Sequence, residues 1–357
     1  MSVAAMGIFR FFVCLFLLVL SSVSFAIDYQ ISSGSWHNCA LDDTGVVCWG
    51  RINEGQTDVP SLSNPTQVSS GSWHNCALDD TGVVCWGRND YGQTDVPSLS
   101  NPTQVSSGGY HSCALDDSGV VCWGRNDYGQ TDVPSLSNPT QVSSGWEHSC
   151  ALDDTGVVCW GLNSYGQTDV PSLSNPTQVS SGRNHSCALD DTGVVCWGSN
   201  SSGQTDVPSL SNPTQVSSGD LHNCALDDTG VVCWGSNTAG QANMPSLSNP
   251  TQVSLGSGHT CALDDTGVVC WGSNNNGNID VPELSFTFDE NDTDTNITSA
   301  VLDIDANGSF DALTDGLIIL RYAFGLRGQS LIDDVISEDA MRNNASDIET
   351  YIETLLP

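Results

Sequence analysis

Two short apolar segments recur along the chain, with a polar turn between them. In the first copy they are residues 39–41 (Cys-Ala-Leu) and 46–49 (Val-Val-Cys-Trp), and Asp-Asp-Thr-Gly separates them. This pattern predicts a β-hairpin. An antiparallel register centred on the turn pairs Leu41 with Val46, Ala40 with Val47 and Cys39 with Cys48. The two sulfur atoms then lie opposite each other, at an expected Cα separation of about 5.5 Å that suits a disulfide.

The cysteine spacing indicates that the hairpin is one unit of a repeat. Cys14 lies near the N-terminus, and the other fourteen cysteines form seven pairs, each beginning 37 residues after the last. The pairs are Cys39 and Cys48, Cys76 and Cys85, Cys113 and Cys122, Cys150 and Cys159, Cys187 and Cys196, Cys224 and Cys233, and Cys261 and Cys270. The seven copies follow one another without an insertion.

Residues 1–26 are typical of a secretory signal peptide. Arg10 precedes an apolar run over residues 11–20, and Ser-Phe-Ala ends the segment at residue 26. The run is shorter than the roughly 20 residues that a membrane span needs, and no later segment approaches one. We therefore expect a secreted chain, extracellular or at the cell surface, with the periplasm as the alternative. In an exported chain a C-x8-C spacing favours disulfides over zinc.

A 37-residue repeat of strands and turns predicts a closed propeller rather than a solenoid. One hairpin cannot bury both of its faces, and the first and last copies carry no special capping sequence. Residues 29–34 match the segment that opens each later unit, while residues 280–284 match the end of a unit, so the N-terminal strand can follow the seventh tail. We expect an all-β, seven-bladed β-propeller over residues 27–285.

The repeat resembles that of the regulator of chromosome condensation family, above all its short-bladed secreted bacterial members. The shared pattern is G-x-x-H-[NST]-C-A-L-D-D-[ST]-G-V-V-C-W-G-x-N-x-x-G-Q, and it departs only at Ile52, in place of Asn, and Asn278, in place of Gln. The resemblance implies a propeller used as a binding disc. Eukaryotic relatives exchange nucleotide on a small GTPase beside chromatin, and one bacterial relative inhibits β-lactamases, but neither role follows from the fold.

The charge of the chain narrows the class of partner. The chain has 42 Asp and Glu against 8 Lys and Arg, a net charge of -34. Nucleic acid is a polyanion that proteins bind mainly through Lys and Arg, so we expect no nucleic-acid partner.

Differences between the repeats indicate where a ligand binds. They concentrate in the two residues before each repeated His and in the residues after each Trp-Gly. These positions hold the arginines of the repeats and every Trp outside Trp-Gly, residue types that dominate binding hot spots. We expect one binding sector in units one to four, formed by Trp36, Trp73, Tyr110, Trp146, Tyr91, Tyr128 and Tyr165 and rimmed by Arg51, Arg88 and Arg125. Drift in tolerant surface loops is the alternative.

Residues that recur in all seven units are interpreted as structural. They are the seven His, the Trp of each Trp-Gly, and the Asp-Asp of each turn. The Asp pairs are accounted for by their role in the turn, where Asp side chains hydrogen-bond the nearby backbone. An enzyme would need unique groups, and the only unmatched acids are Glu54, Asp90, Asp127, Glu147 and Asp220. No nucleophile or base accompanies them, so we expect no enzymatic activity.

The chain changes character after the repeats. An acidic linker over residues 286–299 precedes a cysteine-free segment, 300–357, with helical patterning. This segment contains D-x-D-x-N-G-x-x-D, which matches the first nine positions of an EF-hand loop. The predicted Ca²⁺ ligands are Asp303, Asp305, Asn307, Ser309 and Asp311, with Asp315 near the closing position. The segment resembles one half of a dockerin, which implies a small α-helical domain and a cohesin-like partner, although a second loop is absent.

The sequence thus predicts a secreted, non-enzymatic binding protein. The sector would contact a glycan or a protein, and the calcium module would serve attachment or docking. An inhibitor of an extracellular enzyme is the first alternative, and a carbohydrate-active propeller enzyme is the second.

Overall fold

The computed structural model describes residues 29–286, in which twenty-one strands form seven three-stranded sheets and no helix occurs. The inner strands are β1 (Gln30–Ser33), β4 (Gln67–Ser70), β7 (Gln104–Ser107), β10 (Gln141–Ser144), β13 (Gln178–Ser181), β16 (Gln215–Ser218) and β19 (Gln252–Leu255). The middle strands are β2 (His37–Asp42), β5 (His74–Asp79), β8 (His111–Asp116), β11 (His148–Asp153), β14 (His185–Asp190), β17 (His222–Asp227) and β20 (His259–Asp264). The outer strands are β3 (Gly45–Gly50), β6 (Gly82–Gly87), β9 (Gly119–Gly124), β12 (Gly156–Gly161), β15 (Gly193–Gly198), β18 (Gly230–Gly235) and β21 (Gly267–Gly272).

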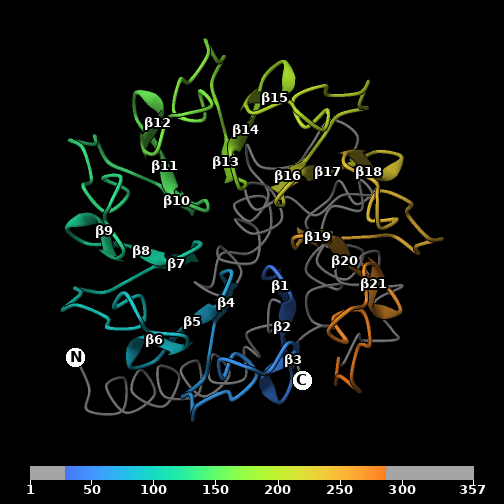
Figure 1. The fold of residues 1–357 in the computed structure, drawn as a ribbon, viewed down its shortest axis with the longest axis horizontal. Coiled ribbons are helices and arrows are strands. Elements are labelled where there is room, and N and C mark those ends of the chain that lie inside the picture. Colours follow the sequence, from blue (N-terminus) through green and yellow to red (C-terminus); the bar gives the residue numbers. More distant parts are fainter. Residues whose placement is uncertain (1–28, 287–357) are drawn as a thin grey trace, which may run out of the picture. The chain divides into compact units, whose positions relative to one another are not determined.

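The seven sheets are the blades of a propeller, as the repeat predicted. They follow one another around a central axis, with β1, β4 and the other inner strands nearest to it (Figure 1). Glutamine side chains join the inner strands of neighbouring blades. For example, the Gln67 side-chain oxygen Oε1 accepts from the Val105 N–H at 2.8 Å. The same bond closes the ring between the last and first blades, where Gln252 accepts from the Ile31 N–H at 2.7 Å.

The register within each blade agrees with the one expected from the sequence. Cys39 pairs with Cys48, Ala40 with Val47 and Leu41 with Val46, and the antiparallel pairing continues out to His37 and Gly50. All seven predicted disulfides are present. Their Cα separations are 4.0–4.1 Å rather than the expected 5.5 Å. The shorter spacing is that of a pair which exchanges no ladder hydrogen bonds, where opposite side chains come closest.

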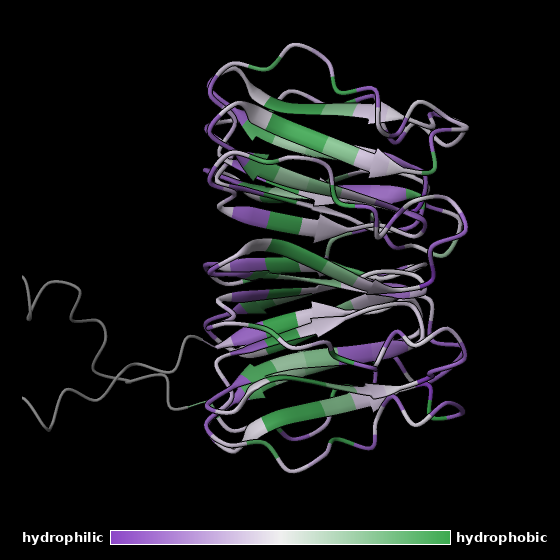
Figure 2. Cartoon of the chain, turned by 90° about the vertical axis from the view of Figure 1, so that its left-hand side faces the viewer, coloured by the Kyte–Doolittle hydropathy of each residue, from purple (hydrophilic) through white to green (hydrophobic). Residues whose placement is uncertain are grey.

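The hydrophobic core is a layer in the middle of the disc. Figure 2 shows apolar residues along the central parts of the strands and polar residues towards both edges. Each interface between two blades buries one small core; between the first two, Cys39 and Leu41 pack against Val68, Ala77 and Trp86. The repeated Trp is therefore a packing residue, as its recurrence predicted.

The repeated histidines link each blade to the next, which confirms their structural role. All seven rings are fully buried, and each Nε2 lies 2.7–2.9 Å from a side-chain oxygen of the following blade. For His74 this oxygen is Ser112 Oγ, whose own proton is donated to the Gln93 carbonyl. Because Ser112 must then accept, Nε2 carries the histidine proton. The last histidine, His259, donates to Asn38 in the first blade and completes the circle.

The loop after each blade reaches forward onto the next one. The main-chain carbonyl of Gln56 accepts hydrogen bonds from Asn75 Nδ2 and Trp86 Nε1 at 2.8 and 3.0 Å. At the closure point the carbonyl of Asn278 accepts from Asn38 and Trp49 of the first blade in the same way. The departure from Gln keeps this contact because it uses the main chain, while the shorter Asn278 side chain accepts from the Asn276 N–H at 3.4 Å, compared with 2.8 Å for Gln56 and the Glu54 N–H.

The Asp-Asp of each hairpin fixes a turn, as expected. Asp79 Oδ1 accepts from the N–H and the hydroxyl of Thr81, and its Oδ2 accepts from the Ser63 N–H of the incoming loop. Burial on its own raises the pKa of Asp79, but these hydrogen bonds outweigh it and leave the pKa lowered. Within residues 29–286 no helix is long and apolar enough to span a membrane.

Candidate functional site

The two variable sets of the sequence lie on the same face of the disc. The first set, residues 35–36 and their equivalents, forms the turns between inner and middle strands, and the second set follows each outer strand. They touch directly, because the Arg51 N–H donates to the Trp36 carbonyl at 3.0 Å and the Arg88 N–H donates to the Trp73 carbonyl at 3.0 Å. We call this side the variable face. The Asp turns lie at the other end of the strands, on the opposite face.

Arginine and aromatic side chains alternate across the first two blades. The rings of Trp36 and Trp73 have centroids 4.6 Å apart at an interplanar angle of 53°. The guanidinium carbon of Arg51 lies 5.4 Å from the centroid of Trp36 and 4.7 Å from that of Trp73. Arg88 approaches Trp73 in turn, at 5.5 Å. These are cation–π distances, so the arginines lie among the rings rather than around their rim.

The same alternation continues through the third and fourth blades. Tyr110 contacts Tyr91 and Trp146 edge to face, with centroids 5.3 and 5.7 Å apart. Arg125 lies 5.2 Å from the centroid of Tyr91, 5.5 Å from that of Tyr110 and 5.6 Å from that of Tyr128. The result is one continuous layer of interacting side chains.

Carboxylates of the same loops hold two of the arginines. Arg88 Nε donates to Asp90 at 2.6 Å, and Arg125 Nε donates to Asp127 at 2.7 Å. Arg125 also pairs with Glu147 of the next blade at 2.9 Å, where both side chains are less than 20% exposed. The hydrogen bond to Asp90 is the main cause that raises the pKa of Arg88. Such pairs fix long side chains and lower the entropy cost of binding.

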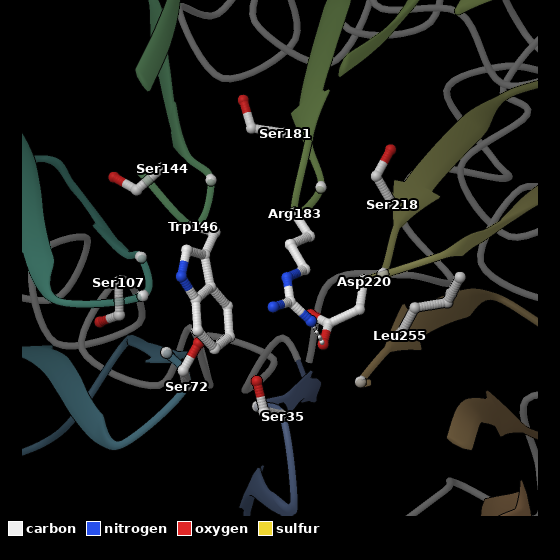
Figure 3. A pocket seen from close by; sticks show the side chains of 18 of the residues that line it. Ser35, Ser72, Ser107, Ser144, Trp146, Ser181, Arg183, Ser218, Asp220 and Leu255 are labelled. Atoms are coloured by element: carbon white, nitrogen blue, oxygen red, sulfur yellow. Dashed lines mark ion pairs between the residues drawn. The ribbon is translucent and has the colours of Figure 1, made fainter. Parts of the chain in front are cut away.

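The layer ends at the mouth of the central channel (Figure 3). Trp146, Arg183 and Asp220 come from three successive blades and lie beside a cavity of about 70 Å³. The Arg183 guanidinium is 4.6 Å from the Trp146 centroid, and one of its nitrogens is 4.0 Å from an Asp220 oxygen. Burial raises the pKa of Asp220, while its hydrogen bond with Ser257 and the charge of Arg183 oppose the shift.

Nearly all predicted sector residues therefore meet in one surface. We call it the arginine–aromatic surface; it consists of Trp36, Arg51, Trp73, Arg88, Tyr91, Tyr110, Arg125, Tyr128, Trp146 and Arg183. Tyr165 lies apart, 57% exposed and without a ring or cation contact to the other described residues.

The sequence analysis did not assign Arg183, Glu147 or Asp220 to the sector, although each occupies a variable position. Arg183 and Asp220 stand at the first residue of their variable pairs, which lines the channel mouth, and Glu147 stands at the second. Trp146 also belongs to the first position, whereas Trp36, Trp73 and Tyr110 occupy the second. Reading the two positions separately would have found the channel residues.

Three sequence predictions fall outside the described residues, among them the acidic linker over residues 286–299 from residue 287 onward. The other two are the signal peptide at 1–26 and the segment 300–357 with the Ca²⁺ ligands Asp303, Asp305, Asn307, Ser309, Asp311 and Asp315. Within residues 29–286 no cluster of three or more His, Cys, Asp or Glu could hold a metal ion.

The regulator of chromosome condensation (RCC1) repeat matches seven segments of the chain, at residues 29–56, 66–93, 103–130, 140–167, 177–204, 214–241 and 251–278. Together they make up more than half of the sequence. The chain belongs to the RCC1 repeat family. No curated protein sequence matches it.

Three solved structures are similar to this chain. The ectodomain of the receptor kinase CR4 from Physcomitrella patens is similar over 68% of this chain and 73% of its own, with 26% identity and a TM-score of 0.58. The ectodomain of the receptor kinase ACR4 from Arabidopsis thaliana is similar over 68% and 97%, with 25% identity and a TM-score of 0.57. Prp20p from Saccharomyces cerevisiae, whose binding to Gsp1p and histones has been described, is similar over 72% and 84%, with 17% identity and a TM-score of 0.57. The first two are ectodomains, and the third shows the fold alone.

Proposed function

We propose that this RCC1-repeat propeller is a non-enzymatic, extracellular binding protein that recognises a protein through its arginine–aromatic surface. Ten interacting side chains on one face, rich in Trp, Tyr and Arg, have the composition of an interface hot spot. The seven disulfides suit an oxidising compartment, and two similar structures are receptor ectodomains.

The arrangement of the rings favours a protein over a glycan. A sugar would stack on a free aromatic face, but Trp73 is contacted by Trp36, Arg51 and Arg88. Tyr110 likewise contacts Tyr91 and Trp146 in addition to Arg88 and Arg125. What such a layer offers is ring edges and guanidinium N–H groups, which suit carbonyl and carboxylate acceptors. This occupation of the ring faces is the observation that carries the proposal.

The surface is also arranged to bind without reordering. Its arginines stack on rings and two of them are held by carboxylates, so little rotamer freedom remains to be lost on association. Burial of a single fixed patch then yields more net affinity than the same area of mobile side chains.

A variant with Trp36, Trp73 and Tyr110 all changed to alanine tests the proposal. We would compare the extracellular proteins of the source organism that are retained by the parent and by this variant, together with a glycan array. A matched control changes Leu221 and Met244, which lie outside the surface, and circular dichroism verifies the fold of all three. The proposal expects a protein retained by the parent and the control but lost from the triple variant. Equal retention by the triple variant, or binding to glycans alone, would refute it.

We also propose that residues 303–315 bind Ca²⁺, on the strength of their oxygen-rich spacing. Calorimetric titration of the full chain with CaCl2 should show one binding event that is lost in Asp303→Ala, which removes the ligand at the first loop position. A parent that releases no heat, or a variant that binds as the parent does, would contradict it.

A further inference from the structure

Arg51 differs from its two counterparts in having no acidic partner. In the second and third repeats the residue two positions after the arginine is Asp90 or Asp127, and each accepts from the arginine Nε. The first repeat has Asn53 at that position. Among the described residues the Arg51 side chain makes no ion pair or hydrogen bond, and its Nε is buried without an acceptor.

Next to the Arg51 side chain lies a second buried N–H donor that has no acceptor. This donor is Trp73 Nε1. The guanidinium carbon lies beside both indole rings, 5.4 Å from the centroid of Trp36 and 4.7 Å from that of Trp73. Arg51 as a whole is only partly buried, so its side chain is accessible to a ligand. An unpaired cation in partly buried surroundings gains more from an anion than an exposed one does, because less water screens the pair.

The loop around Arg51 has the same backbone frame as its counterparts. The Arg51 N–H donates to Trp36 as the Arg88 N–H donates to Trp73, both at 3.0 Å. In the second repeat, Asn89 stabilises the loop by donating a hydrogen bond to Asp95. The first repeat has Ile52 at the equivalent position, and this residue is 68% exposed. The first repeat thus exposes an apolar side chain next to an arginine without a counter-ion, which is a combination that a partner can cover.

We propose that the Arg51 site, formed by Arg51, Trp36 and Trp73, binds a carboxylate side chain of the protein partner, with Ile52 as its apolar neighbour. This inference rests on the proposed function and names the chemistry that one part of the surface recognises. A carboxylate takes two parallel N–H groups of a guanidinium, which is a geometry that a neutral acceptor does not match. Arg88 and Arg125 are already paired within the chain and serve to hold the layer in place.

The repeats supply a test that leaves the core untouched. Asn53→Asp restores the acid of the second repeat and should pair with Arg51 from within the chain. The reciprocal change, Asp90→Asn, removes the partner of Arg88 and should open a second site of the same kind. Both positions lie in exposed loops, so neither variant should alter the fold.

The probe is N-acetyl-tetraglutamate amide, with the tetraglutamine peptide and a galacturonate trimer as parallel arms. Binding is followed through the indole N–H resonances of Trp36 and Trp73. The proposal expects shifts with the glutamate peptide, none with the glutamine peptide, and about fivefold weaker binding in Asn53→Asp, since a competing ion pair contributes about 1 kcal/mol. It also expects increased binding capacity in Asp90→Asn.

Unchanged glutamate binding in Asn53→Asp, or equal binding of the glutamine peptide, would overturn the inference. Binding of galacturonate alone would assign the site to an acidic sugar and overturn it too. These outcomes remain distinct from failure of the proposed function. If the alanine variant of Trp36, Trp73 and Tyr110 loses a protein partner while Asn53→Asp changes nothing, the surface stands and the carboxylate site falls.

Discussion

Acidification should unfold this propeller well above the pKa of its carboxylates. Burial lowers the pKa of all seven histidines, and in several the neighbouring histidines lower it further, to about 3 or about 4. In the unfolded chain a histidine has its ordinary pKa of 6.5. At a pH between the folded and the unfolded pKa, the histidines are protonated in the unfolded state and neutral in the folded state. Stability is therefore complete above about pH 6.5 and falls as the pH drops towards 4.

The loss is large because it is repeated in every blade. At pH 5 each buried neutral histidine lowers the free energy of unfolding by about 2 kcal/mol relative to neutral pH, given about 1.4 kcal/mol per pH unit. Seven of them together remove about 14 kcal/mol, which is comparable to the entire stability of a typical domain. The hairpin aspartates act at lower pH, since their hydrogen-bonded carboxylates have pKa values below the ordinary 3.8.

Denaturant unfolding between pH 7.5 and 5, with disulfides intact and without a polyhistidine tag, measures this effect. The slope of the unfolding free energy against pH should approach seven protons, because all seven histidines of the chain lie in the blades. Replacing one ring, as in His148→Gln, should reduce the slope by about one. A slope below about two protons, or a native histidine resonance that titrates near 6.5, would refute the reasoning.

Further predictions concern the disulfides and the glycines that follow the inner strands. Replacing Cys150 and Cys159 by serine should lower the free energy of unfolding by about 2.5 kcal/mol in denaturant melts, since the bond closes a short loop; peptide mapping of the parent should find only links within blades. A Cβ at Gly145 would lie 2.4 Å from the histidine ring of its own blade, whereas at Gly258 the nearest atom is 3.6 Å away. Gly145→Ala should therefore cost about 2 kcal/mol and Gly258→Ala little, as thermal unfolding would show, and equal melting temperatures would contradict the packing.

The fold could be predicted because the same sequence pattern, and so the same hairpin register, recurs in all seven repeats. The hairpin register follows from Cys39 facing Cys48, and ring closure follows from residues 29–34 matching the start of later units. Even the departure at Asn278 preserves the main-chain contact with the first blade. The Cα spacing was expected wrongly, because about 5.5 Å belongs to a hydrogen-bonded ladder pair, whereas the register places Cys39 and Cys48 at a non-bonded pair, where the Cα atoms lie closer.

The candidate site was predictable only in part. Variation between repeats located Trp36, Trp73 and Tyr110, but it could not show that the two Trp rings contact each other and that Arg51 lies within cation–π distance of both. That placement depends on rotamers and on the distance between neighbouring blades, which no spacing along the chain encodes. The sequence did contain the distinction between Asn53 and Asp90, whose meaning became clear once the ion pair of Arg88 was visible.

Hydrogen–deuterium exchange of the chain with and without its captured protein partner tests the central claim most directly. The account predicts protection in the turns at 35–36, 72–73 and 109–110 and in the loop at 51–54, with no change in the equivalent turn of the last blade at 257–258. Protection centred on the Asp turns of the opposite face, or spread evenly over all seven blades, would contradict it.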